Sequence, residues 1–259
     1  MKNIAIVLAA GQGKRMKSIV PKQFLVMGKE QMLMKSLHVF EKSDIIDEIV
    51  LVTNEDKIKE IKKLVKKKGD CHKVKKVISG GPHRWASVYE GLKVCDNCRY
   101  VFIHDSARPY VTADIIKRAY KAVKEFGAVA VGMPSKDTVK IVDDDGFVAE
   151  TPVRSHVWTI QTPQTFRYQM IKEAYDKLIA ADDMEGITDD AMVMERSGLS
   201  RVKVVEGAYD NLKITTPDDW GKAKAKEEPN MAEEAKKAQK ALDKAAEKEK
   251  KADGKKEKK

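Results

Sequence analysis

The sequence lacks any apolar run that approaches 18 residues, the length that a membrane-spanning helix needs. It also lacks an N-terminal hydrophobic segment followed by a cleavage site, because a strand pattern begins directly at Lys2. We therefore expect a cytoplasmic protein with no membrane partner.

Cysteine is scarce, with only Cys71, Cys95 and Cys98 in the chain. An odd number suits a reducing compartment better than a disulfide framework. Cys95 and Cys98 form a CxxC, and Cys71 with His72 would complete a four-ligand zinc set. We favour the alternative, in which Cys95 ends a helix and Cys98 precedes a strand as small apolar side chains, because a single CxxC is a weak signal.

Large apolar residues are nearly absent from residue 221 onward, where only Met231 and Leu242 remain and no aromatic residue occurs. This segment has fourteen lysines and nine acidic residues. It cannot bury enough apolar surface to offset the entropy lost on ordering. We predict one globular domain at residues 1–225 and a solvated or partly helical tail at residues 226–259.

The same segment carries half of the net charge. The whole chain has 50 Lys and Arg against 40 Asp and Glu, a formal charge of +10, and 36 against 31 remain without residues 221–259. A body with a charge near +5 has no broad nucleic-acid footprint. We expect a protein that handles anionic small molecules, and we do not expect nucleic acid as a partner.

Short apolar runs alternate with stretches of helical periodicity. Strands are predicted at residues 3–8, 48–53, 74–79, 100–104, 128–132 and 201–205. Helices are predicted at residues 31–42, 56–67, 84–94, 113–126, 168–180 and 189–197. This alternation predicts an α/β fold, with a mostly parallel twisted sheet and helices on both faces.

Residues 136–152 interrupt this alternation with two short alternating segments around Asp143-Asp144-Asp145-Gly146. An Asp-Gly pair supports the positive φ angles of a tight turn, so the pattern predicts a β-hairpin. A hairpin has little core of its own. We expect it to project as an arm and to pack on a second subunit.

Glycine-rich or polar segments follow three predicted strands, at residues 9–22, 80–81 and 105–109. Ligands gather at the carboxyl ends of strands in open α/β sheets. The first segment lacks the third glycine of a dinucleotide fingerprint and the Gly-Lys-Ser/Thr of a P-loop. It instead supplies Arg15 and Lys22, which are either solvated surface charges or phosphate ligands. Their position around a glycine turn favours phosphate.

A turn with a fixed Arg and a fixed Lys stabilises the negative charge that develops during phosphoryl or nucleotidyl transfer. Asp105, at the end of a predicted strand, is suited to hold Mg²⁺ against phosphate oxygens. Its alternative role is that of a turn or N-cap aspartate. We expect His104, beside it, to pack rather than to catalyse.

Nine segments carry a family resemblance: LAAGQGKRM, PKQF, GGPHRWASV, HDSARP, KDTVK, TPVR…W, QTPQTF, TDDA and NLKITTP. In this order the chain resembles the 2-C-methyl-D-erythritol 4-phosphate cytidylyltransferases over about residues 1–220. The resemblance implies a Rossmann-like nucleotidyltransferase fold. It also implies transfer of CMP from CTP to 2-C-methyl-D-erythritol 4-phosphate with Mg²⁺, in non-mevalonate isoprenoid synthesis. The substrate phosphate is then the nucleophile, so no nucleophile-base pair is required.

The resemblance also implies the role of each site residue. The expected catalytic residues are Arg15, Lys22, Arg154 and Lys213. The residues expected around CTP are Ala9, Ala10, Gly11, Gly13, Gly81, Ser87, Asp105 and Ala107, with Asp105 also binding the metal. The residues expected around methylerythritol phosphate are Arg108, Thr138, Arg154, Thr162 and Thr188.

In the family the hairpin interlocks two subunits, which implies a homodimer in which Arg154 acts in the neighbouring site. The alternative for Arg154 is a surface salt bridge. Two other functions remain open for the chain. A ribitol 5-phosphate cytidylyltransferase shares several motifs, although Ala10 and Ala107 favour methylerythritol phosphate. A non-catalytic nucleotide-binding protein would act through its basic tail, and the set of Arg15, Lys22 and Asp105 argues against it.

Overall fold

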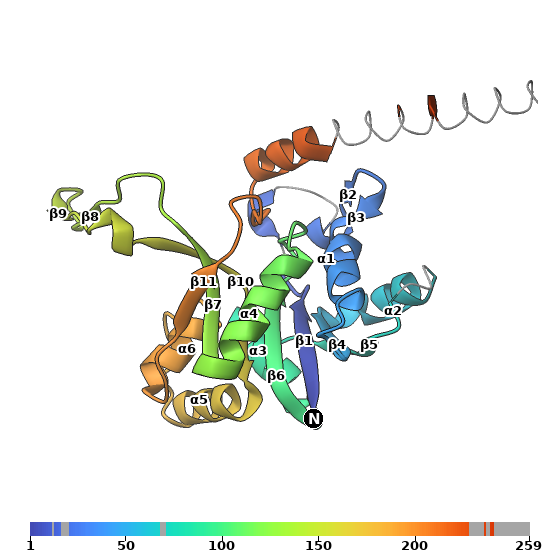
Figure 1. Cartoon of the computed structure of the whole chain (residues 1–259), viewed down its shortest axis with the longest axis horizontal. Helices are drawn as coiled ribbons and strands as arrows, with labels where there is room; N and C mark the ends of the chain where they lie inside the picture. Colours follow the sequence, from blue (N-terminus) through green and yellow to red (C-terminus); the bar gives the residue numbers. More distant parts are fainter. Residues whose placement is uncertain (12, 17–20, 68–70, 228–235, 237–238, 241–259) are drawn as a thin grey trace, which may run out of the picture.

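The computed structural model of the protein describes residues 1–11, 13–16, 21–67, 71–227, 236 and 239–240. Its centre is a seven-stranded sheet in the order β11-β7-β10-β6-β1-β4-β5 (Figure 1). The strands are β1 (Lys2–Leu8), β4 (Glu48–Thr53), β5 (Val74–Ser79), β6 (Cys98–Asp105), β7 (Ala128–Pro134), β10 (Trp158–Arg167) and β11 (Lys203–Glu206). Only β10 runs antiparallel to its neighbours in this sheet, which confirms the mostly parallel α/β prediction.

Helices cover both faces of the sheet, as the alternation of the sequence predicts. One core cluster joins the sheet to α1 (Met32–Glu41), α2 (Ile58–Lys67) and α4 (Ala113–Phe126). The other joins it to α3 (Arg84–Lys93), α5 (Tyr168–Ala180) and α6 (Asp190–Ser197). Side chains alternate along β1, with Ala5 and Val7 in the first cluster and Ile4 and Ile6 in the second.

The order in which successive strands are added to the sheet reverses at β1. From β1 the chain passes to β4 and β5 on one side, and it then returns to place β6 on the other side. The loops that follow β1 and β6 therefore diverge at the carboxyl ends of these strands. Such a switch point forms the crevice where α/β sheets bind ligands.

Strand β10 is not among the strands predicted from the sequence. Its sequence, WTIQTPQTFR, is polar and contains Pro163, which ordinarily argues against a central strand. The strand tolerates this proline because its pairing with β7 shifts register between Gln161 and Gln164. The Thr162-Pro163 peptide bond within this irregularity is cis.

A projecting arm, residues 135–157, leaves the sheet after β7 and returns at β10 (Figure 1). It contains the hairpin strands β8 (Ile141–Val142) and β9 (Val148–Glu150) and the short helix η4 (Arg154–His156). Gly146 has φ 87°, and its N–H donates to the Asp143 carbonyl at 3.1 Å. The predicted hairpin and its positive-φ turn are therefore confirmed.

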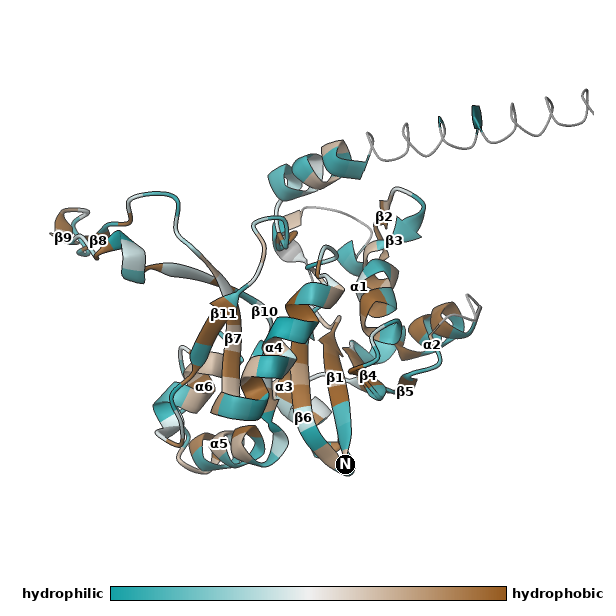
Figure 2. Ribbon diagram, viewed as in Figure 1, coloured by the Kyte–Doolittle hydropathy of each residue, from teal (hydrophilic) through white to brown (hydrophobic). Residues whose placement is uncertain are grey.

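Apolar side chains of the arm face solvent. The exposed fraction is 72% for Phe147, 57% for Val148 and 63% for Val153. Figure 2 shows the hydrophobic residues of β8 and β9 far from the body of the molecule. These side chains are exposed in the single subunit.

Shorter elements complete the edge of the molecule that carries the site. They are η1 (Lys14–Met16), η2 (Lys22–Phe24), β2 (Val26–Met27), β3 (Glu30–Gln31) and η3 (Glu55–Lys57). A third, small core cluster contains Met16, Met27, Met32, Ile214 and Ala223. It packs η1 against β2, α1 and the C-terminal helix.

The C-terminal helix, residues 217–227, crosses the predicted boundary between domain and tail. Ala223 is buried, and its carbonyl accepts the Tyr110 hydroxyl at 3.1 Å. Glu227 pairs with Lys35 of α1 at 2.8 Å. The rest of the predicted tail lies outside the described residues, apart from positions 236, 239 and 240. No helix in the described part of the chain is long and apolar enough to cross a membrane.

Two of the cysteines lie where the packing interpretation places them. Cys95 follows α3 and Cys98 begins β6, and both are buried. Their thiols donate to the carbonyls of Gly91 and Tyr100 at 3.2 and 3.3 Å. The neighbouring Cys95 thiol and burial raise the pKa of Cys98. Cys71 lies in the core cluster on the opposite face of the sheet.

Candidate active site

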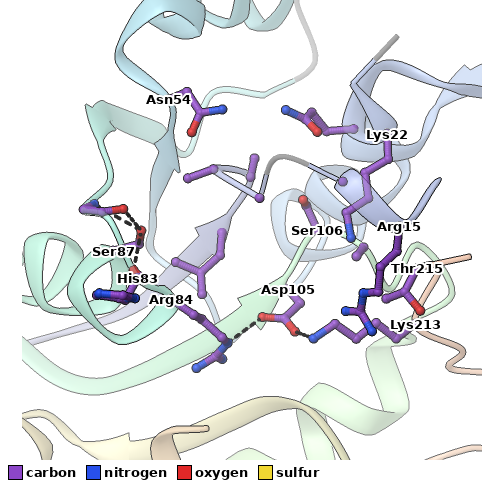
Figure 3. Close-up of a pocket in the computed structure, with 18 of the residues that line it drawn as sticks. Arg15, Lys22, Asn54, His83, Arg84, Ser87, Asp105, Ser106, Lys213 and Thr215 are labelled. Atoms are coloured by element: carbon purple, nitrogen blue, oxygen red, sulfur yellow. Dashed lines mark hydrogen bonds and ion pairs between the residues drawn. The ribbon is translucent and has the colours of Figure 1, made fainter. Parts of the chain in front are cut away.

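A pocket of about 580 Å³ opens at the carboxyl ends of β1 and β6, at the switch point of the sheet. Most of its lining residues follow β1, precede or begin α3, end β6 or lie in the loop before the C-terminal helix, and Asn54 follows β4 (Figure 3). Among them are Ala9, Ala10, Gly11, Gly13, Arg15, Lys22, Gly81, Ser87, Asp105, Ala107 and Lys213. These eleven were all predicted to belong to the site.

The loop after β1 carries the cations. Gly13 adopts φ 64°, a conformation that favours glycine, and leads into η1. Met16 of η1 is buried in the third core cluster, whereas Arg15 is exposed and lines the pocket. One anchored residue thus fixes the direction of its charged neighbour.

Lys22 begins η2 and points into the same pocket. Its ammonium donates to the Ile214 carbonyl at 3.3 Å. Burial, and then repulsion from Lys213, lower the pKa of Lys22 from its usual value of 10.5. A bound anion would therefore stabilise the protonated form of Lys22 in this pocket.

Asp105 is the last residue of β6 and is 7% exposed. One carboxylate oxygen accepts from Arg84 Nε at 3.1 Å, and the other pairs with Lys213 Nζ at 2.6 Å. Burial alone would raise the pKa of Asp105, but the charges of Arg84 and Lys213 outweigh it and hold the pKa well below its usual range. Asp105 is a carboxylate at neutral pH. Figure 3 shows it between Arg84 on one side and Lys213 on the other.

Arg84 connects Asp105 to a second buried carboxylate. Its Nη2 donates to Asp190, at the start of α6, at 2.8 Å. Asp190 is fully buried and also accepts the Tyr175 hydroxyl at 2.7 Å. Burial would lower the pKa of Arg84, but the charges of Asp190 and Asp105 outweigh it and raise the pKa well above its usual value. Arg84 and Asp190 both lie in motifs quoted above, but neither was predicted to have a role in the site.

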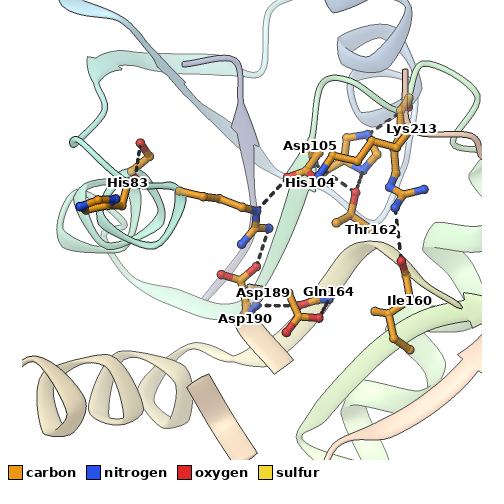
Figure 4. A network of polar contacts seen from close by, with 12 residues as sticks. His83, His104, Asp105, Ile160, Thr162, Gln164, Asp189, Asp190 and Lys213 are labelled. Atoms are coloured by element: carbon orange, nitrogen blue, oxygen red, sulfur yellow. Dashed lines mark hydrogen bonds and ion pairs between the residues drawn. The ribbon is translucent and has the colours of Figure 1, made fainter. Parts of the chain in front are cut away.

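The two glutamines of QTPQ, Gln161 and Gln164, hydrogen-bond β10 to neighbouring segments. Gln164 Oε1 accepts the backbone N–H groups of Asp190 and Ala191, each at 2.9 Å, which fixes the N-terminus of α6 (Figure 4). Gln161 Nε2 donates to the Ala208 carbonyl at 2.8 Å, and Gln161 Oε1 accepts from Asn211 at 3.2 Å. β10 thereby fixes both α6 and the loop that leads to Lys213.

Two residues predicted for the substrate pocket, Arg108 and Thr162, lie behind the pocket wall. The Arg108 guanidinium donates to the carbonyls of Asn211 and Ile160 at 2.8 and 3.3 Å. Burial lowers the pKa of Arg108. Thr162 is 4% exposed, and its hydroxyl oxygen accepts the Asp105 N–H at 3.1 Å.

The three remaining predicted residues lie away from the pocket. Thr138 and Arg154 are exposed on the arm, and Thr188 is exposed in the loop before α6. The Thr188 hydroxyl contacts the Met192 sulfur at 3.7 Å. The structure of one subunit does not bring these three to the cations, and their roles stay predictions.

His104 lies beside Asp105 in β6 but does not line the pocket. It is fully buried and packs against Phe40, with ring centroids 5.0 Å apart. Burial lowers the pKa of His104 from its ordinary value of 6.5 to about 4. The ring is therefore neutral at physiological pH.

The donor set at Asp105 fits a magnesium ion that is shared with a nucleotide. Among the described residues, no group of three or more His, Cys, Asp or Glu is arranged to hold a metal. Mg²⁺ characteristically binds through one or two carboxylates together with substrate phosphates. An ionised Asp105 beside a cationic pocket meets that description.

Comparison with known proteins agrees with this geometry. The family model for 2-C-methyl-D-erythritol 4-phosphate cytidylyltransferase matches residues 3–227. The enzyme of that name from Clostridium botulinum (strain 657 / Type Ba4) is 46% identical over 219 residues, which cover 84% of this chain and 94% of the relative. That from Lachnospira eligens is 43% identical over 217 residues, 84% of this chain and 95% of the relative.

Solved structures are similar over most of the chain. The crystal structure of 4-diphosphocytidyl-2C-methyl-D-erythritol synthase from Anaerococcus prevotii has a TM-score of 0.77 and 36% identity, covering 86% of this chain and 95% of that one. The cytidylyltransferase from Francisella tularensis has a TM-score of 0.71 and 30% identity, covering 86% and 98%.

The buried neutral imidazole predicts a loss of stability in mild acid. Between pH 6.5 and about 4 the unfolded chain binds a proton at His104 that the folded chain does not, so the free energy of unfolding falls as the pH falls. The full effect is roughly 3 kcal/mol. Urea unfolding across this range should give a smaller loss for His104→Asn than for the wild type. Equal pH dependence in the two proteins would contradict a neutral His104.

Proposed function

Because the chain belongs to the 2-C-methyl-D-erythritol 4-phosphate cytidylyltransferase family, we propose that it transfers CMP from CTP to 2-C-methyl-D-erythritol 4-phosphate. The products are 4-diphosphocytidyl-2-C-methyl-D-erythritol and pyrophosphate, in the non-mevalonate route to isoprenoids. The observation that carries the proposal is one pocket in which Arg15, Lys22 and Lys213 lie around a buried, ionised Asp105.

The reaction needs positioning and charge stabilisation more than proton transfer. An oxygen of the substrate phosphate attacks the α-phosphorus of CTP and forms a P–O bond. The bond from that phosphorus to the β-phosphate oxygen breaks, and pyrophosphate leaves with the electron pair. The attacking phosphate is largely dianionic at neutral pH because its second pKa is about 6. A general base is therefore unnecessary.

Arg15 and Lys22 are the groups that we propose to stabilise the five-coordinate α-phosphorus. Both charges lie on turns held by packed neighbours, so little reorganisation is needed when charge develops on the phosphate oxygens. The carbonyl of Ile214 supports Lys22 from behind. Lys213, which directly precedes Ile214 in the chain, would hold the attacking phosphate.

The base and ribose of CTP would lie against small residues. Ala9, Ala10, Gly11 and Gly13 line one wall, and Gly81 and Ser87 line another. A Cβ at Gly81 would lie 2.5 Å from the Ala86 side chain, so glycine is required there. The Ser87 hydroxyl oxygen accepts the Gly81 N–H at 3.2 Å and holds this turn in place.

Asp105 would hold the Mg²⁺ ion. When bound, the ion would neutralise charge on the nucleotide phosphates. Arg84 keeps one oxygen of Asp105 in a fixed direction, and the oxygen now paired with Lys213 faces the pocket residues. The low pKa of Asp105 supports this assignment, because the carboxylate needs no deprotonation to bind a cation.

We extend the proposal to a homodimer in which the arm of each subunit reaches the pocket of the other. The exposed apolar side chains of the arm support it, because contiguous apolar surface of this kind marks an interaction site. Thr138 and Arg154 would then meet the methylerythritol phosphate of the neighbouring site. A cytoplasmic location is also proposed, supported by the buried thiols of Cys95 and Cys98.

Substitution of Lys22 by alanine tests the assignment of the cations. We expect Lys22→Ala to lower kcat by about a hundredfold or more, because it removes one preorganised charge from the transition state. Pyrophosphate release from CTP and methylerythritol phosphate measures it. Lys62→Ala, on the exposed surface of α2, is the matched control and should retain the wild-type rate. A chain that ends at residue 228 should also retain it. Loss of activity in the shortened chain, with little effect of Lys22→Ala, would instead assign the function to the tail.

Subunit complementation tests whether Arg154 acts in the neighbouring site. Lys22→Ala and Arg154→Ala should each be nearly inactive as homodimers. A heterodimer of the two variants has one site with both Lys22 and Arg154 if the arm is exchanged, so it should recover about half of the wild-type activity. Differently tagged chains, purified through both tags, provide the heterodimer. If Arg154 served its own subunit, neither site would be complete and no activity would return.

A further inference from the structure

His104 is a buried polar residue that the proposed reaction does not use. It directly precedes Asp105 in β6, and its side chain is on the opposite side of the strand from the pocket. The ring is fully buried, yet both of its nitrogens have a partner. A histidine that served only to fill space would leave these polar atoms unsatisfied at a cost in free energy.

The contacts of His104 form a continuous chain of hydrogen bonds (Figure 4). His104 Nδ1 lies 3.0 Å from the Thr162 hydroxyl, which itself accepts the backbone N–H of Asp105 at 3.1 Å. His104 Nε2 lies 3.3 Å from the carbonyl of Arg108. The ring therefore links the backbone of Asp105, through Thr162, to the backbone of Arg108.

The neighbours of the ring select one tautomer. The Arg108 carbonyl is an acceptor, so Nε2 must carry the hydrogen and donate it. The Thr162 oxygen already accepts from Asp105, so its own hydrogen is available to donate to Nδ1. A neutral ring protonated at Nε2 satisfies all three groups at once.

The two ends of this chain connect to different parts of the site. Asp105 lies with the pocket residues that we assign to CTP and the metal. Arg108 reaches the carbonyls of Asn211 and Ile160, and Asn211 begins the loop that carries Lys213. Movement of the Arg108 turn would therefore shift the groups assigned to the acceptor phosphate.

We propose that His104 is a positioning residue that sets the nucleotide half and the acceptor half of the site relative to each other. Through Nδ1 and Thr162 it holds the backbone of Asp105. Through Nε2 it holds the turn of Arg108 and, beyond it, the loop of Lys213. The assignment of the two halves rests on the function proposed above.

Substitution of His104 by asparagine or by glutamine tests its two links separately. Asparagine in place of His104 has an oxygen near the position of Nδ1 and keeps the acceptor for Thr162, but it does not reach Arg108. Glutamine reaches the position of Nε2 and keeps the donor to Arg108, but it loses the acceptor for Thr162. Each variant thus retains one of the two hydrogen bonds that the His104 ring makes.

We expect His104→Asn to raise KM for methylerythritol phosphate about tenfold, with kcat and KM for CTP near the wild-type values. We expect His104→Gln to lower kcat and to raise KM for CTP about tenfold, with KM for methylerythritol phosphate little changed. These changes correspond to the loss of one buried hydrogen bond. Thr162→Val should resemble His104→Gln, because it removes the same link.

Phe40→Leu is the matched packing control. It alters the ring contact of His104 and leaves the hydrogen bonds in place, so it should lower the midpoint of urea unfolding without either kinetic pattern. If the two His104 variants instead lower kcat and raise both KM values to the same extent, or change none of them, the proposal is overturned.

The tautomer of the wild-type ring gives a readout that does not depend on activity or on a variant that folds well. In ¹⁵N-labelled protein, the His104 ring should show a protonated Nε2 and an unprotonated Nδ1 at neutral pH. Its signals are assigned by their loss in His104→Gln or, if that variant does not fold, by selective labelling and coupling to Thr162. Protonation at Nδ1 would overturn the proposal. This test remains valid even if the wild type fails to use methylerythritol phosphate, which would refute the proposed function alone.

Discussion

The carboxylate of Asp105 is the group on which the rest of the site depends. A charged side chain buried to 7% exposure is stable only when it is paired and hydrogen-bonded. Arg84 and Lys213 provide the charges, and Thr162 holds the backbone N–H. These partners come from α3, from β10 and from the loop after residue 211, so satisfying the buried polar groups of this one residue brings three distant segments to the end of β6.

A second layer of buried polar groups keeps this arrangement rigid. Asp190 pairs with the far end of Arg84, and Gln164 fixes the backbone on which Asp190 lies. The charges alternate from Lys213 through Asp105 and Arg84 to Asp190, so no member is left unpaired. Without Arg84, no positive charge would lie between the buried carboxylates of Asp105 and Asp190, and they would repel each other. A nucleotide site needs such support, because small displacements of its stabilising groups are costly in rate.

The sequence predicts the parts of this architecture that depend on local patterns. Alternating apolar runs predict six strands and six helices near their observed positions, and the Asp-Gly turn predicts the arm. The glycine loop and its two cations, Arg15 and Lys22, can also be predicted, because they lie within one short segment of the sequence. Strand β10 was missed because Pro163 and its polar neighbours hide a central strand that tolerates them at an irregular pairing. Arg84, Asp190 and Gln164 were missed because their roles arise only from contacts between segments up to 106 residues apart. Nothing in the chain's own pattern pairs them, although each lies within a quoted motif.

The chemistry assigned to the site depends on which polyol phosphate accepts CMP. The most direct measurement is pyrophosphate release from CTP with 2-C-methyl-D-erythritol 4-phosphate and, separately, with ribitol 5-phosphate, each with Mg²⁺ and with EDTA. We expect rapid release and formation of 4-diphosphocytidyl-2-C-methyl-D-erythritol with the first substrate, much slower release with the second, and none in EDTA. A clear preference for ribitol 5-phosphate, or no consumption of CTP with either substrate, would contradict the proposed function.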